Sequence, residues 1–226
     1  MKSLINKNYE IFSLLIIAIS LSGALLAFRI KFLKSFYLLF LVWNIILAVI
    51  PYVITMYLST IKLTKLKLGI WFCIWLLFLP NAPYIITDLL HLKLSSSSML
   101  WLDILVILSF ACTGMLLFFL SLNDMKLLIG EQFKKVPVKH LTTLIIFLCA
   151  FGVYLGRFLR YNSWEVISNP MNLLSDIFKI VVYPNQNFQV WLFTLGFGFF
   201  LWVGFRLFNK LYSTVYITLQ ISVTLR

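Results

Sequence analysis

The chain has 226 residues, of which 62% are hydrophobic and only 12% are charged, with a mean hydropathy of +1.00. Soluble domains carry about 25% charged residues, so this composition excludes an ordinary soluble protein. A formal charge of +12 would suggest nucleic-acid binding in a soluble protein. Here, however, the cations stand between long apolar runs, where they orient a chain against an anionic membrane surface. We therefore expect a polytopic membrane protein surrounded by lipid, with no nucleic-acid partner.

Apolar runs of about 18 residues or more are long enough to cross a bilayer core of ~30 Å, and they predict six helices in a single integral membrane domain, residues 1–226. The expected spans are 11–28, 36–57, 69–92 broken at 80–83, 99–121, 141–159 and 188–205. The first run is long and no small-x-small site ends it, so we interpret it as an uncleaved helix. The tail 207–226 is either a frayed interfacial segment or a seventh span.

The third span is interrupted. The apolar run Gly69–Leu79 has 11 residues, which is ~16 Å of α-helix and too short to cross. The span either continues through Pro80–Pro83 as a broken helix or turns back as a re-entrant segment. Past the break we expect an α-helix capped by Asn81, with Pro83 in its first turn.

A polar stripe follows the break. Tyr84, Thr87, Asp88 and His91 are spaced i, i+3, i+4 and i+7, which places them on one face of an α-helix. Ionisable groups at membrane depth are tolerated where neighbours or water satisfy them. The stripe is therefore expected to face the interior of the bundle.

Residues 170–183 form a different kind of helix. Asn169-Pro170 is a typical helix start, and apolar residues recur at helical spacing opposite Asn172, Ser175, Asp176 and Lys179. This pattern predicts an amphipathic helix lying in the membrane interface.

Small residues inside the apolar runs are expected to serve packing. No paired spacing indicates a disulfide or metal set for Cys73, Cys112 and Cys149. Close helix packing is the expected role of Gly196, Gly198 and Gly204.

Six spans divide the basic residues unequally between the two sides. Twelve cations fall on one side: Lys2, Lys7, Lys62, Lys65, Lys67, Lys126, Lys134, Lys135, Lys139, Arg206, Lys210 and Arg226. Seven fall on the other: Arg29, Lys31, Lys34, Lys93, Arg157, Arg160 and Lys179. The positive-inside rule then predicts a cytoplasmic N-terminus.

This orientation brings separate polar stretches to one outer level. The candidate catalytic residues there are Asp88, His91 and Asp103, and the candidate ligand-binding residues are Asn81, Tyr84, Arg157, Arg160 and Asn162. The first three could form an acid–base or metal set, or Asp88 and His91 could simply bond each other or free carbonyls. No metal site is predicted, because His140 is expected on the opposite side. Arg157 and Arg160 could clamp a phosphate, snorkel to the interface, or pair with Asp88 or Asp103.

Several motifs together resemble a known family. These are Leu-Pro-Asn-Ala-Pro-Tyr at 79–84 with Thr-Asp-Leu-Leu-His-Leu at 87–92, Trp101-x-Asp103, Ser-Phe-Ala at 109–111, Gly156-Arg157, and Asn-Ser-Trp at 162–164. From about residue 40 to 205 the chain is similar to domain-of-unknown-function family 1361, a group of bacterial multi-pass membrane proteins. The resemblance implies a bacterial integral membrane protein, which we expect in the inner membrane, and it brings no activity, substrate or catalytic residue with it.

The leading hypothesis for function is an outward-facing polar pocket that binds or processes an anionic lipid or lipid-linked phosphate. A small-solute transporter is the second possibility, because broken helices are typical of transporters. The third is a non-catalytic partner in an envelope assembly. Whether the protein is an enzyme, which cofactor it uses and its oligomeric state stay open.

Overall fold

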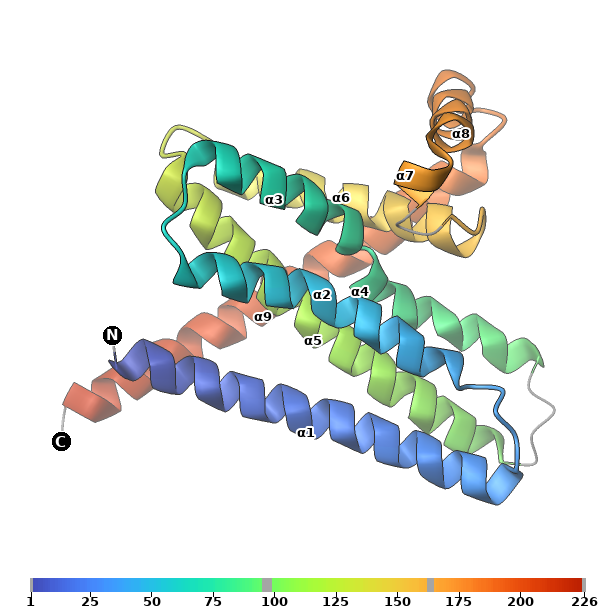
Figure 1. Ribbon diagram of the computed structural model, residues 1–226, viewed down its shortest axis with the longest axis horizontal. Coiled ribbons are helices and arrows are strands. Elements are labelled where there is room, and N and C mark those ends of the chain that lie inside the picture. The colour runs from blue at the N-terminus through green and yellow to red at the C-terminus, as the bar shows by residue number, and fades with distance from the viewer. Residues whose placement is uncertain (1, 95–98, 162–164, 225–226) are drawn as a thin grey trace. The chain divides into compact units, whose positions relative to one another are not determined.

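A computed structural model describes residues 2–94, 99–161 and 165–224, and in these residues every regular element is helical (Figure 1). The elements are α1 (Lys2–Leu33), α2 (Phe40–Thr60), α3 (Lys65–Phe78), α4 (Asn81–Tyr84), the 3₁₀-helix η1 (Ile85–Leu94), α5 (Leu100–Gln132), α6 (Val138–Arg157), α7 (Glu165–Ser168), α8 (Pro170–Val182) and α9 (Phe188–Thr224). The six expected spans are present as helices long and apolar enough to cross a membrane. The all-α, polytopic membrane fold is thereby confirmed.

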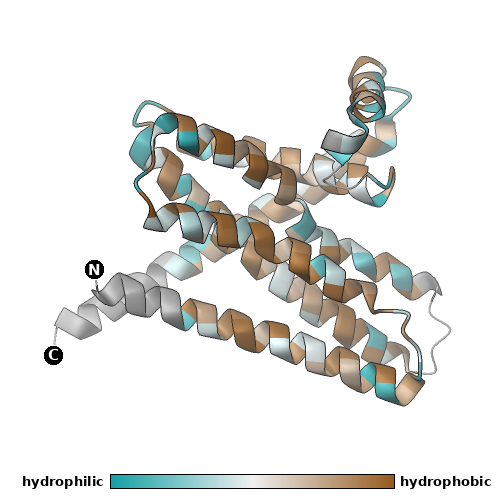
Figure 2. Cartoon of the chain, viewed as in Figure 1, coloured by the Kyte–Doolittle hydropathy of each residue, from teal (hydrophilic) through white to brown (hydrophobic). Residues whose placement is uncertain are grey.

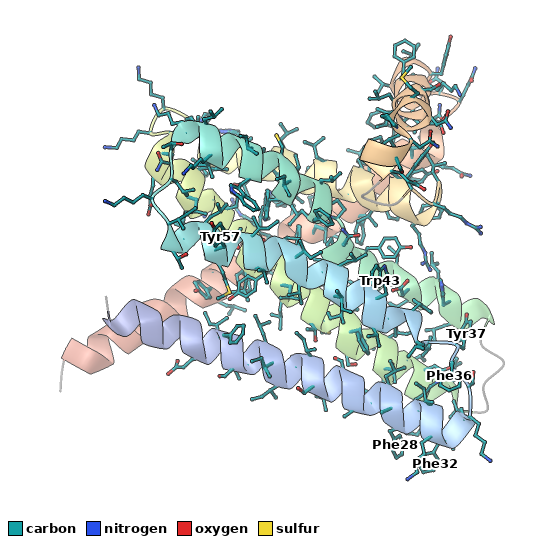
Figure 3. The ribbon with its side chains drawn as sticks, in the orientation of Figure 1. Phe28, Phe32, Phe36, Tyr37, Trp43 and Tyr57 are labelled. Atoms are coloured by element: carbon teal, nitrogen blue, oxygen red, sulfur yellow. The ribbon has the colours of Figure 1, made fainter. Side chains whose placement is uncertain are left out.

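Lipid is the solvent to which these helices are suited. Figure 2 shows apolar residues along the lengths of the helices, with polar residues gathered toward their ends and in the loops. Phe28 and Phe32 project from the end of α1 and are about half exposed, as is Trp43 on α2 (Figure 3). Large exposed apolar side chains of this kind would be unfavourable in water but match a hydrocarbon surrounding.

Three helices are longer than predicted. Helix α1 continues to Leu33 and so includes Arg29, which the sequence placed beyond the first span. Helix α5 continues to Gln132, so most of the expected connection 122–140 is helical. Residues 207–224 extend α9 rather than forming a separate helix. In each case a helix runs on past its apolar stretch, because backbone hydrogen bonding does not stop where hydropathy falls.

The chain packs as two compact units: unit 1 comprises Met1–Ile54 and Phe78–Phe118, and unit 2 comprises Thr55–Leu77 and Phe119–Arg226. Fully buried apolar side chains form the core of unit 1, among them Leu41, Ala48, Ile85, Val106 and Ile107. The same holds in unit 2 for Trp75, Ile146, Cys149, Ala150 and Leu201. The single domain expected from the sequence stays a prediction.

In unit 2, helices α6 and α9 pack closely and run antiparallel. A Cβ on Gly198 would lie 2.5 Å from the ring of Phe147, and Gly204 faces the ring of Phe119 on α5 in the same way. Those two glycines therefore serve the close packing predicted for them. Gly196 has open space around it, so the same prediction is wrong there.

The other small residues differ among themselves. Cys149 is buried in the α6 core, whereas Cys73 and Cys112 are exposed. The expected packing role is therefore correct for one cysteine of the three. Exposure on an apolar helix places the other two thiols on the surface suited to lipid.

Helix α8 is amphipathic, as expected. It starts with Asn169 at the N-cap and Pro170 in the first turn. Leu173 and Ile180 are buried, while an apolar row that includes Met171 and Phe178 stays exposed. An exposed apolar row of this kind is typical of a helix that lies at the membrane interface.

The break in the third span is built by backbone contacts in unit 1. Asn81 lies inside α4 rather than capping it, and its amide Nδ2 donates to the carbonyl of Phe78 at 2.9 Å. The predicted cap is wrong, because the amide satisfies the open end of α3 instead. Gly114 of α5 faces this turn, and a Cβ there would lie 2.5 Å from the Ala82 carbonyl oxygen. The turn and α5 can approach this closely only because residue 114 has no side chain.

Candidate functional site

The candidate site lies in unit 1, on the segment that follows the break. Asp88 of η1 is completely buried. One of its oxygens, Oδ2, accepts a hydrogen bond of 2.7 Å from the amide of Asn44 on α2. A carboxylate removed from solvent needs such partners, since burying it without them costs several kcal/mol. Helices α2 and η1 are thus joined by a polar contact inside an apolar bundle.

The segment is a 3₁₀-helix of ten residues, not the predicted α-helix. Runs longer than about four residues are uncommon in this conformation. With about three residues per turn, residues three apart eclipse each other. Asp88 and His91 therefore share one edge with Ile85, whereas Tyr84 and Thr87 lie on the neighbouring edge. The single polar stripe expected from the sequence is split in two.

His91 is half-buried between aromatic rings of unit 1. Its imidazole lies 4.7 Å from the ring of Phe40 and 6.3 Å from the ring of Tyr37, measured between centroids. The hydroxyl of Tyr37 donates to the backbone carbonyl of His91 at 3.0 Å. These contacts fix the end of η1 against the start of α2.

Two polar side chains near the break, those of Asn81 and Thr87, donate hydrogen bonds to backbone carbonyls. Asn81 holds the Phe78 carbonyl as described, and the carbonyl of Tyr84 accepts a hydrogen bond of 2.6 Å from the hydroxyl of Thr87. The side chains of Asn81 and Tyr84 are half-buried. A ligand-binding role for either stays a prediction.

Asp103 is engaged elsewhere in unit 1. Its Oδ1 accepts a hydrogen bond of 2.9 Å from Nε of Arg29, and both side chains are almost wholly buried. Arg29 also donates through Nη1 to the backbone carbonyl of Ser35, which follows α1. The arginine thus ties the first turn of α5 to the end of α1. Asp103, one of the predicted catalytic residues, therefore has a clear structural role.

Arg157 and Arg160 belong to unit 2. Arg157 is the last residue of α6 and is half-buried, while Arg160 is exposed and left-handed, with φ of 62°. Their predicted pairing with Asp88 or Asp103 stays a prediction. Asn162 lies outside the described residues.

Beside these arginines, Tyr161 donates to Oδ2 of Asp176 on α8 at 2.8 Å, and Lys179 contacts Oδ1 at 3.2 Å. The hydrogen bond to Asp176 raises the pKa of Tyr161, and the same bond, aided by Lys179, lowers the pKa of Asp176. This exposed cluster fixes α8 to the end of α6.

Within residues 2–94, 99–161 and 165–224, no three His, Cys, Asp or Glu side chains lie close enough to hold one ion. Asp88 and His91 nevertheless offer a carboxylate and an imidazole one 3₁₀ turn apart. That pair suits proton transfer better than metal coordination.

Sequence reasoning missed three residues of this site: Arg29, Asn44 and Gly114. Arg29 follows a long apolar run, which made it look like a loop cation, and Asn44 is a single polar residue within the second span. Their partners are 74 and 44 residues away in sequence. The one available signal was a strongly polar side chain inside or directly beside an apolar run.

A bundle of apolar helices with a broken third span and buried ionisable side chains defines an integral membrane protein. Residues 43–203 match the model of the family described as "Protein of unknown function (DUF1361)", and the chain belongs to that family. The resemblance drawn from the motifs is thereby confirmed. Neither the curated proteins nor the solved structures contain a match.

Proposed function

We propose that this protein binds or processes an anionic lipid or a lipid-linked phosphate at the polar site around η1. The observation that carries the proposal is Asp88, a completely buried carboxylate held by Asn44 at 2.7 Å on an irregular segment of an apolar bundle. Ionisable groups inside membrane bundles mark functional sites far more often than they serve stability alone. A carboxylate and an imidazole on one edge also supply a proton acceptor and a proton donor.

An amphiphile is the substrate class that suits this surrounding. The helices of unit 1 expose apolar faces to lipid, so a lipid can approach them from the bilayer without crossing water. An anionic head group is favoured because Arg157 and Arg160 are predicted to lie at the outer face of the membrane. Arginine matches phosphate oxygens with two parallel hydrogen bonds.

Transport of a small solute is the second candidate, favoured by the conformation of η1. Broken helices near mid-membrane form the binding sites of many transporters, and long 3₁₀ segments often mark hinges. Solute movement across the membrane, without chemical change, would be the expected activity.

The test compares purified wild-type protein with Asp88→Asn, His91→Ala and the control Asp176→Asn, which removes a carboxylate from exposed α8. Asparagine at 88 can still accept the Asn44 hydrogen bond, so this variant removes charge at nearly constant shape. Anionic phospholipid, zwitterionic phospholipid and a lipid-linked diphosphate are supplied, and head-group release and lipid retention are measured per folded protein. We expect loss of turnover or retention in the first two variants and none in the control.

Wild-type activity that survives Asp88→Asn unchanged would rule out this site. Solute flux in liposomes, lost in Asp88→Asn while head groups stay intact, would favour transport instead. A stable co-purifying protein, with neither activity present, would point to an assembly partner.

A further inference from the structure

A second polar feature lies in unit 2, where α5, α6 and α9 line a half-open pocket of about 290 Å³. The lining side chains are Lys126, Lys139, Thr142, Thr143, Ile146, Trp202, Phe205, Arg206, Asn209 and Lys210. None of them belongs to the site around η1. The pocket thus offers a separate binding chemistry.

Four of the ten lining residues are cations. Lys126, Lys139 and Arg206 contribute three positive charges, Lys210 contributes a fourth, and none of the described residues that line the pocket is acidic. The Arg206 guanidinium lies 5.2 Å from the centre of the Trp202 ring, a cation–π contact that fixes its position. Clustered cations beside a hydroxyl and an amide are the groups that bind a phosphate.

These cations are built into helices rather than carried on loops. Lys126 lies in the later turns of α5, Lys139 in the first turn of α6, and Arg206 and Lys210 within α9. Basic residues that only orient a membrane protein need no shared position and are usually found in connections. A bound ligand explains better than membrane orientation why basic side chains from three helices converge on one pocket.

The lining changes character along the helices. On α6 the lining begins with the cationic Lys139 and ends with the apolar Ile146. On α9 it changes in the same way from the cationic Arg206 back to the apolar Trp202. The two helices run antiparallel, since Phe147 of α6 lies against Gly198 of α9, whereas Phe158, at the end of α6, contacts Phe193, earlier on α9. The cationic ends of the two lining segments therefore lie together, and their apolar ends lie together deeper along the helices. An amphiphile with a phosphate at one end is complementary to that arrangement.

The size of the pocket limits what enters it. Sites for whole drug-sized ligands have volumes of about 300–1,000 Å³, so 290 Å³ is enough for a head group only. The acyl chains of a lipid would stay in the bilayer beside Trp202, which is partly exposed. Basic pockets between membrane helices on the cytoplasmic side are a known means of holding anionic head groups.

We propose that the pocket lined by Lys126, Lys139 and Arg206 binds a phosphate group, delivered as the head group of an anionic phospholipid. Free phosphate shares the same chemistry, and the experiment separates the two sources. Because the pocket lies among residues that the positive-inside count puts in the cytoplasm, the bound lipid would come from the inner leaflet. The proposal does not rest on any activity of the η1 site.

The test measures lipid retention by native mass spectrometry of the full chain, released from detergent after incubation with phosphatidylglycerol, phosphatidylcholine or inorganic phosphate. The variants are Arg206→Gln, Lys139→Gln and their double. The matched control is Lys134→Gln/Lys135→Gln, which removes two exposed charges from the α5–α6 connection without touching the pocket. Arg206→Lys, which keeps the charge, tests rescue.

We expect wild type to retain phosphatidylglycerol over phosphatidylcholine, and the double variant to bind it about tenfold more weakly, as expected when charge-assisted hydrogen bonds are lost. The control should bind as wild type, and the tenfold loss in the double variant should persist in an Asp88→Asn background, which separates this proposal from the fate of the η1 site. Arg206→Lys should recover part of the binding.

Equal loss in the control would show general surface attraction and overturn the proposal. Retention of inorganic phosphate alone, abolished by Arg206→Gln, would overturn the lipid assignment. Because glutamine replaces side chains that are exposed at the pocket mouth, each variant is expected to elute as a folded species, and circular dichroism checks this.

Discussion

Arg29 and Asp103 form an ion pair in the interior of unit 1, with Nε and Oδ1 2.9 Å apart and side-chain exposures of 3% and 0%. The pair joins α1 to α5 across 74 residues of sequence. Removing one partner of such a pair lowers the stability of the fold, because the remaining charge is left buried without its partner. It is the strongest polar contact between those two helices that the structure describes.

Asp103→Asn should therefore destabilise the protein by about 3–5 kcal/mol. Arg29→Gln should cost a similar amount, and the double variant Arg29→Gln/Asp103→Asn should recover part of the loss, since no charge is then left alone. The measurement is the temperature at which half of the detergent-solubilised protein loses its monodisperse peak. Asp176→Asn, in an exposed pair, is the control and should change stability by no more than about 1 kcal/mol. Additive losses in the double variant would contradict a coupled pair.

Gly114→Ala should destabilise unit 1 by about 1–3 kcal/mol, because the new methyl group would overlap the Ala82 carbonyl oxygen. Backbone atoms have to move to relieve the overlap, and the break that carries Asp88 moves with them.

Gly23→Ala in α1 is the matched control. Nothing lies within 4 Å of its Cβ position, and alanine is a better helix former by up to about 1 kcal/mol, so this variant should be neutral or stabilising. The same heating assay reports both. If the two substitutions changed stability equally, the turn would not be held closely against α5.

The Tyr161–Asp176 contact should give the docking of α8 a defined pH dependence. The pKa of Asp176 is lowered, so its contribution is present above the ordinary aspartate pKa of 3.8 and is lost as pH falls through the folded-state pKa. The pKa of Tyr161 is raised from 10.0, so its contribution is present at lower pH and is lost as pH rises through the raised value.

Hydrogen exchange of the α8 amides should therefore accelerate at acidic pH, below about 4, and again above about 10, beyond the intrinsic pH dependence of exchange. Tyr161→Phe removes the hydrogen bond and should flatten both changes. A profile in Tyr161→Phe that matches wild type would exclude this contact as the cause.

The orientation is tested by labelling. In a background without Cys73, Cys112 and Cys149, Ser97→Cys should react with an impermeant maleimide in intact cells, and Lys135→Cys should react only after lysis. The reason is the unequal division of cations between the two sides. The reverse pattern would invert the orientation and move the Lys126–Arg206 pocket to the outer leaflet.

Long apolar runs predicted the helices well, since a span of this kind needs only length and hydropathy. The break at Pro80–Pro83 and the α8 start at Asn169-Pro170 were also predictable, because proline acts on its own local backbone. The ends of α5 and α9 were not, since Lys126 and Arg206 look the same in a loop as on a helix. Convergence of these cations on one pocket depends on α6 and α9 packing together, which no local pattern records.

The site was less predictable than the fold for a related reason. Asp88 and His91 could be selected from the sequence because charged groups are rare at such depth. The partners of Asp88 and of Asp103 could not be selected, since Asn44 and Arg29 reach them only through tertiary packing. The conformation of η1 is likewise decided by context: Gly114 admits the backbone at Ala82, and the segment is held at its other end by Tyr37.

The conformation of η1 also changes the reach of the third span. A 3₁₀-helix rises about 2.0 Å per residue against 1.5 Å for an α-helix, so its ten residues extend about 5 Å farther than they would as α-helix. Rewinding the segment would draw His91 back toward Asn81 and rotate it by about 60° around the axis relative to Asp88. The length of this span and the angle between its two ionisable groups are therefore coupled, so stretching or thinning of the bilayer would change the angle between Asp88 and His91.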